Sequence, residues 1–179
     1  MMLKLESPEF IEKAKHIKLV IFDVDGVLTD GRIYVDDHGF EMKAFHVLDG
    51  IGTQWLQQSG FEVAIISGRY ADGVKHRLEK LGIQHIFLGV ENKKAVFESL
   101  LSELKLTPIQ TAYMGDDLPD LPLLKSVGLG VTVPNAVQEV LNQTSFVTQK
   151  KGGKGAVREL CEALLKSQAK WETFLLKYR

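Results

Sequence analysis

Two aspartates set two positions apart, directly after an apolar run, are the strongest chemical signal in this sequence. The run covers residues 17–22, and Asp23 and Asp25 follow it. Carboxylates at i and i+2 beyond a strand project to the same side and repel each other, which a hard cation such as Mg²⁺ would relieve. One carboxylate could then attack phosphorus while the other moves a proton. The alternative is an Asp-rich turn, with Gly26 and Asp30 as turn residues.

A second candidate site follows the apolar run at residues 61–66. This run ends in Ser67, Gly68 and Arg69. A hydroxyl group and free backbone N–H groups beside the start of a helix are well suited to bind an anion. We therefore expect these residues to contact a negatively charged group.

Lys93 and a second acidic cluster complete the set. Lys93 opens an amphipathic helix predicted for residues 93–105, where a lysine has the wrong charge for the helix dipole and so indicates an anionic partner. The apolar run at 111–114 leads into a cluster made of Gly115, Asp116, Asp117 and Asp120. Because open α/β sheets build their sites at the carboxyl ends of strands, we expect these groups to meet there.

The elements that must position these residues alternate between strand and helix patterns. Strands are expected at 17–22, 61–66, 85–88, 111–114, 128–133 and 145–148, and helices near 50–59, 71–81, 93–105 and after Pro119. This alternation predicts an α/β fold with a three-layer, doubly wound parallel sheet. No internal repeat or linker interrupts the pattern, so we expect residues 1–179 to form a single domain.

A β-hairpin inserted after the first strand is predicted for residues 32–46. Apolar and polar residues alternate on both sides of a turn at 36–39. An isolated hairpin is only marginally stable in water, so it must pack on its own domain or on another subunit.

Composition indicates a small globular protein. The chain has 179 residues, a formal net charge of −1 and one cysteine. A charge so close to zero argues against a nucleic-acid or membrane partner recruited by bulk charge. Cys161 cannot form an internal disulfide and is expected to be a partly buried residue of a C-terminal helix. A reducing cytoplasm is the expected compartment, and no signal peptide is apparent.

In order and spacing, the four features resemble the four motifs of the haloacid dehalogenase superfamily of phosphotransferases. The motifs are DxDGxLTD at Asp23–Asp30, Ser67, Lys93, and the acidic cluster that ends at Asp120. Members often insert a cap domain after motif one or between motifs two and three. Neither interval has room for one here, so the resemblance is to the capless branch.

Within that branch, the chain is similar to the 3-deoxy-D-manno-octulosonate (Kdo) 8-phosphate phosphatases, which make free Kdo for bacterial lipopolysaccharide. The resemblance rests on residues 29–31, 45–50, 67–69, Arg77 before 81–83, and 152–159. It implies a homotetramer whose hairpins meet as a barrel and whose C-terminal segments reach neighbouring sites. Leu48 departs from the basic residue usual before Asp-Gly. A phosphatase for another sugar acid, such as 2-keto-3-deoxy-nonulosonate 9-phosphate, therefore stays open, as does a non-catalytic assembly module.

The resemblance also implies a phosphomonoesterase mechanism. Asp23 would be the nucleophile and Asp25 the general acid and base. Mg²⁺ would be held by Asp23, the Val24 carbonyl and Asp116, with Asp25 as a further candidate ligand. The remaining roles would be phosphoryl binding by Ser67, Gly68 and Lys93, and support of Lys93 or of metal-bound waters by Asp117 and Asp120. Asp120 could equally cap the following turn.

Three further assignments concern the substrate and the flanking loops. Arg69 and Arg77 are candidates for the sugar-acid carboxylate, because a guanidinium group matches a carboxylate bidentately, although a solvated helix face would also explain them. The segment 152–155 lacks the full phosphate-loop pattern, so a flexible lid or a loop leading into a helix is favoured. His46 is interpreted as a sheet or interface residue rather than a catalytic one.

Overall fold

The computed structural model describes residues 4–176, which fold around one six-stranded parallel sheet. The strands are β1 (Leu19–Phe22), β4 (Glu62–Ser67), β5 (His85–Leu88), β6 (Thr111–Met114), β7 (Leu129–Thr132) and β8 (Phe146–Val147). Their order is β5-β4-β1-β6-β7-β8, and each adjacent pair is parallel. The chain runs outward from β1 to β5 and then crosses to β6 on the other side of β1. The predicted doubly wound sheet is therefore confirmed.

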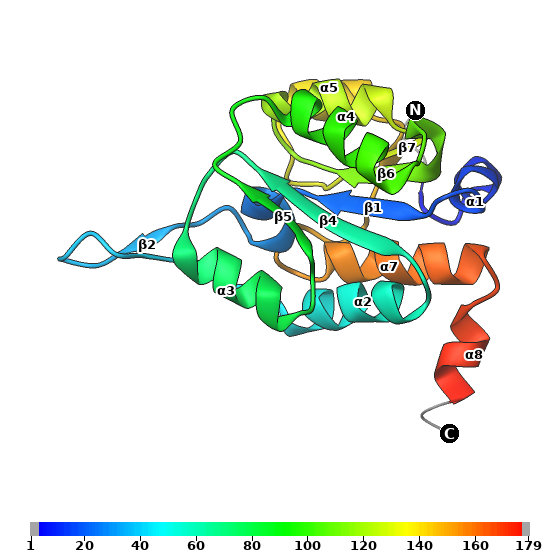
Figure 1. Ribbon diagram of the computed structural model, residues 1–179, viewed down its shortest axis with the longest axis horizontal. Coiled ribbons are helices and arrows are strands. Elements are labelled where there is room, and N and C mark those ends of the chain that lie inside the picture. Colours follow the sequence, from blue (N-terminus) through cyan, green and yellow to red (C-terminus); the bar gives the residue numbers. More distant parts are fainter. Residues whose placement is uncertain (1–3, 177–179) are drawn as a thin grey trace.

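Helices cover both faces of the sheet. They are α1 (Pro8–Ala14), α2 (Val47–Gln58), α3 (Asp72–Lys80), α4 (Lys93–Leu104), α5 (Leu121–Ser126), α6 (Gln138–Gln143), α7 (Ala156–Ser167) and α8 (Trp171–Leu175), with short helical turns η1 (Val24–Leu28), η2 (Pro108–Gln110) and η3 (Leu118–Asp120). In Figure 1, α4 and α5 lie above the sheet, while α2, α3 and α7 lie below it. This confirms the three layers, and residues 4–176 include no cap domain. Over the same residues, no helix is both long and apolar enough to cross a membrane.

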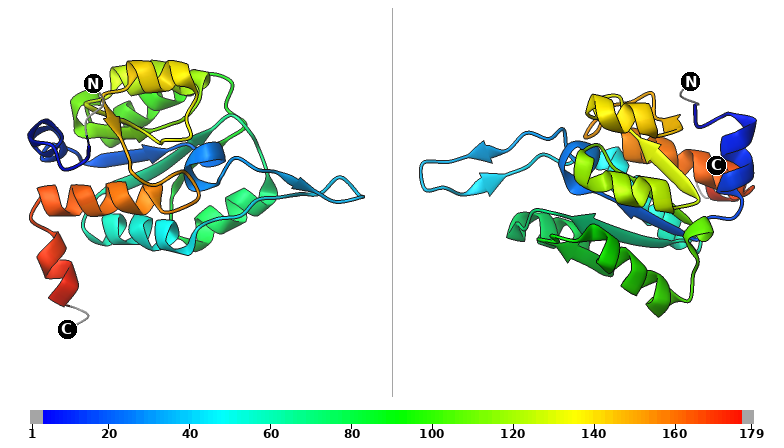
Figure 2. Two further views of the ribbon diagram at one scale, coloured as in Figure 1. Left: turned by 180° about the vertical axis from the view of Figure 1, so that it is seen from behind. Right: turned by 90° about the horizontal axis from the view of Figure 1, so that it is seen from above.

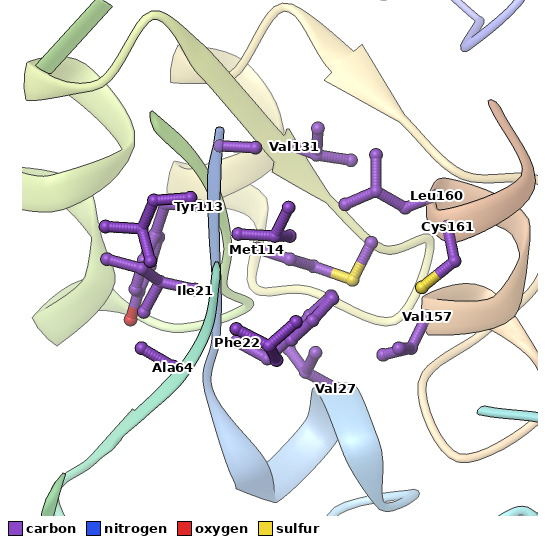
Figure 3. Packing of buried hydrophobic residues seen from close by; sticks show 14 of the residues in the cluster. Ile21, Phe22, Val27, Ala64, Tyr113, Met114, Val131, Val157, Leu160 and Cys161 are labelled. Atoms are coloured by element: carbon purple, nitrogen blue, oxygen red, sulfur yellow. The ribbon is translucent and has the colours of Figure 1, made fainter. Parts of the chain in front are cut away.

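Burial on both faces of the sheet explains why β1 is a continuous run of apolar residues. Its two faces are both covered, so side chains that alternate in direction are buried on either side. Figure 3 shows Phe22 directed toward α7 and Ile21 directed away from it. Cys161 lies on the inner side of α7 and is 0% exposed. The expectation that Cys161 is only partly buried is therefore wrong, because this face of α7 packs directly on the sheet.

The predicted hairpin forms, with short strands. Strands β2 (Tyr34–Val35) and β3 (Glu41–Met42) pair antiparallel, and the hairpin extends beyond the body of the molecule (Figure 2). In the turn, Asp36 Oδ1 accepts hydrogen bonds from two backbone N–H groups. The apolar side chains of the hairpin stay exposed, by 50% to 69%: Tyr34, Val35, Phe40 and Met42. Its own domain therefore does not bury them.

Candidate active site

The loops after β1, β4 and β6 meet at the carboxyl edge of the sheet. Since β1 pairs with β4 on one side and β6 on the other, Phe22 lies in register with Ile65 and Met114, and the residues beyond these positions converge. They surround a pocket of about 290 Å³, lined by Asp23, Asp25, Gly26, Gly31, Ser67, Gly68, Arg69, Lys93, Asp116, Asp117, Pro119 and Asp120. The structure thus brings residues from all four predicted motifs into one pocket.

The loop that carries Asp23 and Asp25 is folded back on itself by Thr29. The Thr29 hydroxyl donates to the Val24 carbonyl oxygen at 3.3 Å and accepts from the Gly31 N–H at 3.2 Å. The backbone N–H of Thr29 also donates to the Val24 carbonyl, at 3.0 Å. The Val24 carbonyl, offered above as a metal ligand, thus accepts two hydrogen bonds inside the loop, and its role as a ligand stays a prediction.

Gly26 lets the two acidic loops approach each other. It has φ +84°, and a Cβ atom there would lie 1.9 Å from Asp116 Oδ2. Any larger residue would therefore displace the Asp116 carboxylate as well as strain the backbone. The glycine of the first motif is needed for the position of the aspartate in the fourth.

Lys93 lies between two carboxylates. Its Nζ donates to Asp23 Oδ1 at 2.9 Å and to Asp120 Oδ1 at 2.7 Å, and all three side chains are buried. The hydroxyl of Tyr113 donates to the same Asp120 oxygen at 2.6 Å. The anionic partner expected for Lys93 is thus a pair of carboxylates. Sequence reasoning missed Tyr113, because a tyrosine in an apolar strand cannot be distinguished by pattern from other residues of the core.

Asp120 has two roles at once. Its Oδ1 binds Lys93, while its Oδ2 accepts from the backbone N–H groups of Asp116 at 2.9 Å and Asp117 at 3.1 Å. Asp120 therefore contacts Lys93 as the sequence suggested. The alternative that it caps the following turn is wrong, because its side chain makes no capping hydrogen bond to α5 and accepts from the two preceding N–H groups instead. Asp117 is exposed, and its Oδ1 accepts from the Leu118 N–H at 2.8 Å, which caps η3.

Crowding of negative charge shifts the proton affinities of this cluster. Burial, together with the nearby Asp120, raises the pKa of Asp23 to about 6 despite the adjacent Lys93. Burial and the charge of Asp23 raise the pKa of Asp116 to about 8. Burial alone would lower the pKa of Lys93, but the two carboxylates beside it produce a net increase. A site with these shifts favours a bound cation.

A divalent cation fits between Asp23 and Asp116. Oxygen atoms of Asp23, Asp116 and Asp120 lie within 4.8 Å of one another. Asp116 Oδ1 is buried and has no hydrogen-bond partner, whereas both oxygens of Asp120 already accept hydrogen bonds. Asp23 and Asp116 are therefore better placed than Asp120 to offer oxygen atoms to a cation. A hard cation such as Mg²⁺ prefers such carboxylate ligands.

Asp25 is not one of the three carboxylates of this cluster, and its role as a further ligand stays a prediction. Lys43, at the end of the hairpin, places its Nζ 2.7 Å from both carboxylate oxygens of Asp25. Arg69 Nε lies 4.0 Å from Asp25 Oδ2, and Arg69 Nη2 donates to Glu41 at 2.9 Å. Sequence reasoning missed Lys43, because nothing in the hairpin pattern distinguishes it from a solvated lysine.

Comparison with known proteins agrees with this geometry. Residues 90–160 match the family model of haloacid dehalogenase-like hydrolases. The 3-deoxy-D-manno-octulosonate 8-phosphate phosphatases of Salmonella typhimurium and Escherichia coli are each 47% identical over 164 residues, covering 92% of this chain and 87% of theirs. The chain belongs to the Kdo 8-phosphate phosphatase family.

Solved structures extend the likeness to three dimensions. A Kdo 8-phosphate phosphatase from Moraxella catarrhalis, in complex with magnesium, phosphate and KDO, is 44% identical with a TM-score of 0.92, covering 94% of this chain and 97% of that one. A probable YrbI-family phosphatase from Pseudomonas syringae is 48% identical with a TM-score of 0.94, covering 96% and 98%. The capless fold is therefore shared over nearly the whole length of these family members.

Several predicted residues lie outside the pocket of this Kdo 8-phosphate phosphatase family member. Arg77 is on α3, where its guanidinium group lies against Gly50 at the start of α2. Leu48 lies on α2, 44% exposed, and does not line the pocket. His46 precedes α2, with its Nδ1 4.0 Å from Asp49 Oδ2. Within one chain, neither Arg77 nor Leu48 lines the pocket at Asp23.

The glycine segment at 152–155 leads into α7 and braces the loop after β1 that carries Asp23 and Gly26. The Gly152 N–H donates to Asn135 Oδ1 at 2.7 Å, and Asn135 Nδ2 donates in turn to the Gly26 carbonyl at 2.9 Å. The Gly153 N–H donates to the Val27 carbonyl at 2.9 Å. This matches the favoured loop leading into a helix, and no residue of the segment lines the pocket.

Proposed function

We propose that this protein hydrolyses Kdo 8-phosphate to Kdo and phosphate through an aspartyl-phosphate intermediate. The observation that carries the proposal is the pairing of Asp23 with Lys93 at the floor of the pocket, 2.9 Å apart. A carboxylate held beside an ammonium group can approach a phosphate dianion that it would otherwise repel. Family membership, and the relative whose structure holds magnesium, phosphate and KDO, indicate the substrate.

In the proposed first step, a carboxylate oxygen of Asp23 attacks phosphorus and the bond to the sugar oxygen breaks. Asp25 gives its proton to that oxygen, and free Kdo leaves. In the second step, water attacks the phosphorus of the aspartyl phosphate while Asp25 takes a proton from it. Phosphate leaves, and both aspartates return to their starting states.

The other pocket residues would bind charge. Ser67, Gly68 and Lys93 would contact the phosphoryl oxygens, and Lys93 would stabilise their charge in the transition state. Asp120 would hold Lys93 in position, and Asp117 would support the loop. Mg²⁺ held by Asp23 and Asp116 would supply further positive charge at the phosphoryl group.

Arg69 is the proposed contact for the sugar-acid carboxylate. It lines the pocket beside Asp25, and its side chain is 53% exposed, so a ligand can replace Glu41 as its partner. Arg77 would serve such a carboxylate only in the site of another subunit, since it lies outside the pocket of its own chain. The substrate class is therefore a sugar-acid phosphate.

We also propose that the protein is a cytoplasmic homotetramer of single-domain subunits, active in lipopolysaccharide precursor synthesis. The four exposed apolar side chains of the hairpin support an assembly, because they gain burial only against another chain. The lack of a cap supports it too, since a neighbouring subunit can close the open side of the pocket.

Phosphate release from a panel of sugar phosphates, each measured with and without Mg²⁺, tests the proposal. The expected result is the highest kcat/KM for Kdo 8-phosphate and no turnover without a divalent metal. A higher value for 2-keto-3-deoxy-nonulosonate 9-phosphate would replace the substrate and keep the chemistry. No turnover of any ester would instead indicate the non-catalytic module.

A further inference from the structure

Lys43 carries a buried positive charge outside the pocket. Nothing in the sequence distinguishes it from other lysines. It follows β3 directly, at the point where the hairpin returns to the body of the molecule. Its side chain is 4% exposed, compared with 22% for Asp25 and 53% for Arg69. Lys43 is also not among the residues that line the pocket.

The contact of Lys43 with Asp25 fixes both groups. Its Nζ is 2.7 Å from each of the two carboxylate oxygens, so the ammonium group sits across the end of the carboxylate. A buried ammonium group needs a partner of opposite charge, and the hydrogen bond to Asp25 supplies it. Arg69, which is bound to Glu41 on the same hairpin, approaches Asp25 Oδ2 only to 4.0 Å.

We propose that Lys43 is the positioning residue for Asp25, and that the hairpin thereby delivers part of the catalytic machinery within its own chain. This inference rests on the proposed phosphatase function, in which Asp25 is the general acid and base. Lys43 does not line the pocket and contacts Asp25, so it acts through Asp25. Asp25 gives one proton to the leaving oxygen and regains one from water.

The nature of the leaving group separates this role from a merely structural one. A sugar alkoxide is a poor leaving group and needs the proton from Asp25, whereas the acetate expelled from acetyl phosphate needs none. For both substrates, kcat/KM reports only the steps up to the phosphorylated enzyme. A misplaced Asp25 should therefore reduce kcat/KM for the sugar phosphate and leave that for acetyl phosphate nearly unchanged.

The test compares Lys43→Met with Lys43→Arg and with the control Lys75→Met, an exposed lysine of α3. With Lys43→Met, we expect kcat/KM for Kdo 8-phosphate to fall at least about tenfold more than kcat/KM for acetyl phosphate, within the range ascribed to a general acid. Lys43→Arg should recover part of the loss, and Lys75→Met should change neither value. Equal losses on both substrates would overturn the proposal. If the panel favours another alkyl phosphate, that ester takes the place of Kdo 8-phosphate.

A second measurement does not depend on turnover. The melting temperatures of Lys43→Met, Asp25→Asn and the double variant form a cycle. Because either single change leaves one buried charge without its partner, we expect the double variant to lose less than the sum of the two single losses. Additive losses would overturn the proposed pairing even in an active enzyme. A coupled cycle in a protein that hydrolyses no ester would refute the phosphatase function alone.

Discussion

At the scale of single residues, the site depends on two aspartates, each of which occupies the space that a side chain would fill if a nearby glycine were replaced. The Asp116 carboxylate lies where a side chain on Gly26 would be, and Asp120 lies where one on Gly115 would be, with its Cβ 2.5 Å from that position. Two loops that are far apart in sequence are thereby locked together. Burial, followed by the density of carboxylates, raises the pKa values of Asp23 and Asp116.

Asp23→Asn should abolish turnover while the fold survives. The change is nearly isosteric, but the amide cannot attack phosphorus, so phosphate release should fall by more than about 100-fold, roughly 2.7 kcal/mol in barrier. Thermal melting should remain cooperative, because the change removes one of several negative charges that repel each other and so does not destabilise the fold. The control is Glu98→Gln on the exposed side of α4. Activity within about tenfold of wild type would exclude Asp23 as the nucleophile.

Arg69→Ala should weaken turnover of Kdo 8-phosphate far more than turnover of acetyl phosphate, which has no sugar-acid carboxylate. Loss of a charged hydrogen bond costs about 1.5–3 kcal/mol, on the order of ten- to a hundredfold in kcat/KM. Steady-state kinetics on both substrates decide the point. Equal losses would place Arg69 at the phosphoryl group or in the scaffold, where its ion pair with Glu41 would matter instead.

At the scale of elements, two segments distant in sequence hold the loop between β1 and the hairpin. The segment at 152–155 donates hydrogen bonds to Val27 and to Asn135, and the Asn135 amide donates in turn to the Gly26 carbonyl. The returning hairpin supports the loop through Lys43. The loop after β1 that carries Asp23 therefore depends on contacts with distant segments, which no local sequence pattern predicts.

Gly152→Ala tests the support from the glycine segment. A Cβ at this position would lie 1.7 Å from the Gly26 carbonyl oxygen, so either the segment or the loop after β1 must move. We expect a loss of about 1–3 kcal/mol in the free energy of unfolding, together with reduced phosphate release. Gly73→Ala is the matched control: nothing lies within 4 Å of its added methyl group, and a helical Gly→Ala change should stabilise by about 0.5 kcal/mol. Wild-type activity and stability for Gly152→Ala would contradict the bracing role.

At the scale of the whole molecule, two features of the single chain indicate binding partners, namely a cation and another protein chain. The acidic cluster concentrates negative charge that a cation would balance, and the hairpin exposes apolar side chains that another chain would bury. Metal binding and assembly are therefore measurable as changes in the stability and mass of the intact protein.

Mg²⁺ should raise the melting temperature more at pH 8 than at pH 5. Without metal, the pKa of Asp116 is about 8 in the folded protein, against an ordinary value of 3.8. Between these values the folded state holds more protons, so the stability from this group is lost as the pH rises from about 4 to about 8. Mg²⁺ binds the ionised carboxylate and offsets that loss at the upper end. An equal rise in melting temperature at both pH values would contradict a cation site at Asp116. So would the same rise in Asp116→Asn.

Light scattering on a sizing column should give about four times the 20.0 kDa chain mass. Phe40→Asp places a charge on the 69% exposed apolar tip of the hairpin and should shift the protein toward smaller species. Ile109→Asp, at a similarly exposed position on η2, is the control and should leave the mass unchanged. A fully active wild-type monomer would contradict the proposed tetramer.

The sequence by itself determined the sheet, the order of its elements and the four motifs, because each depends on local signals. The apolar runs mark the strands, as at 85–88 and 111–114, where the predicted bounds match those observed. The carboxyl ends of parallel strands share one edge, so Asp23, Ser67 and Asp116 had to meet there.

Only the tertiary structure decided which of these groups face each other. Lys43 and Asn135 contact the site from a hairpin and a loop, 18 and 109 positions away from their partners. Tyr113 contacts it from a buried strand, where a tyrosine is indistinguishable from ordinary core in the sequence. Arg77 lies against α2 for a similar reason, since α3 and α2 are brought together by the fold. Residue type and spacing fix the edge of the sheet at which a group lies, whereas its orientation depends on packing between segments that the sequence does not place side by side.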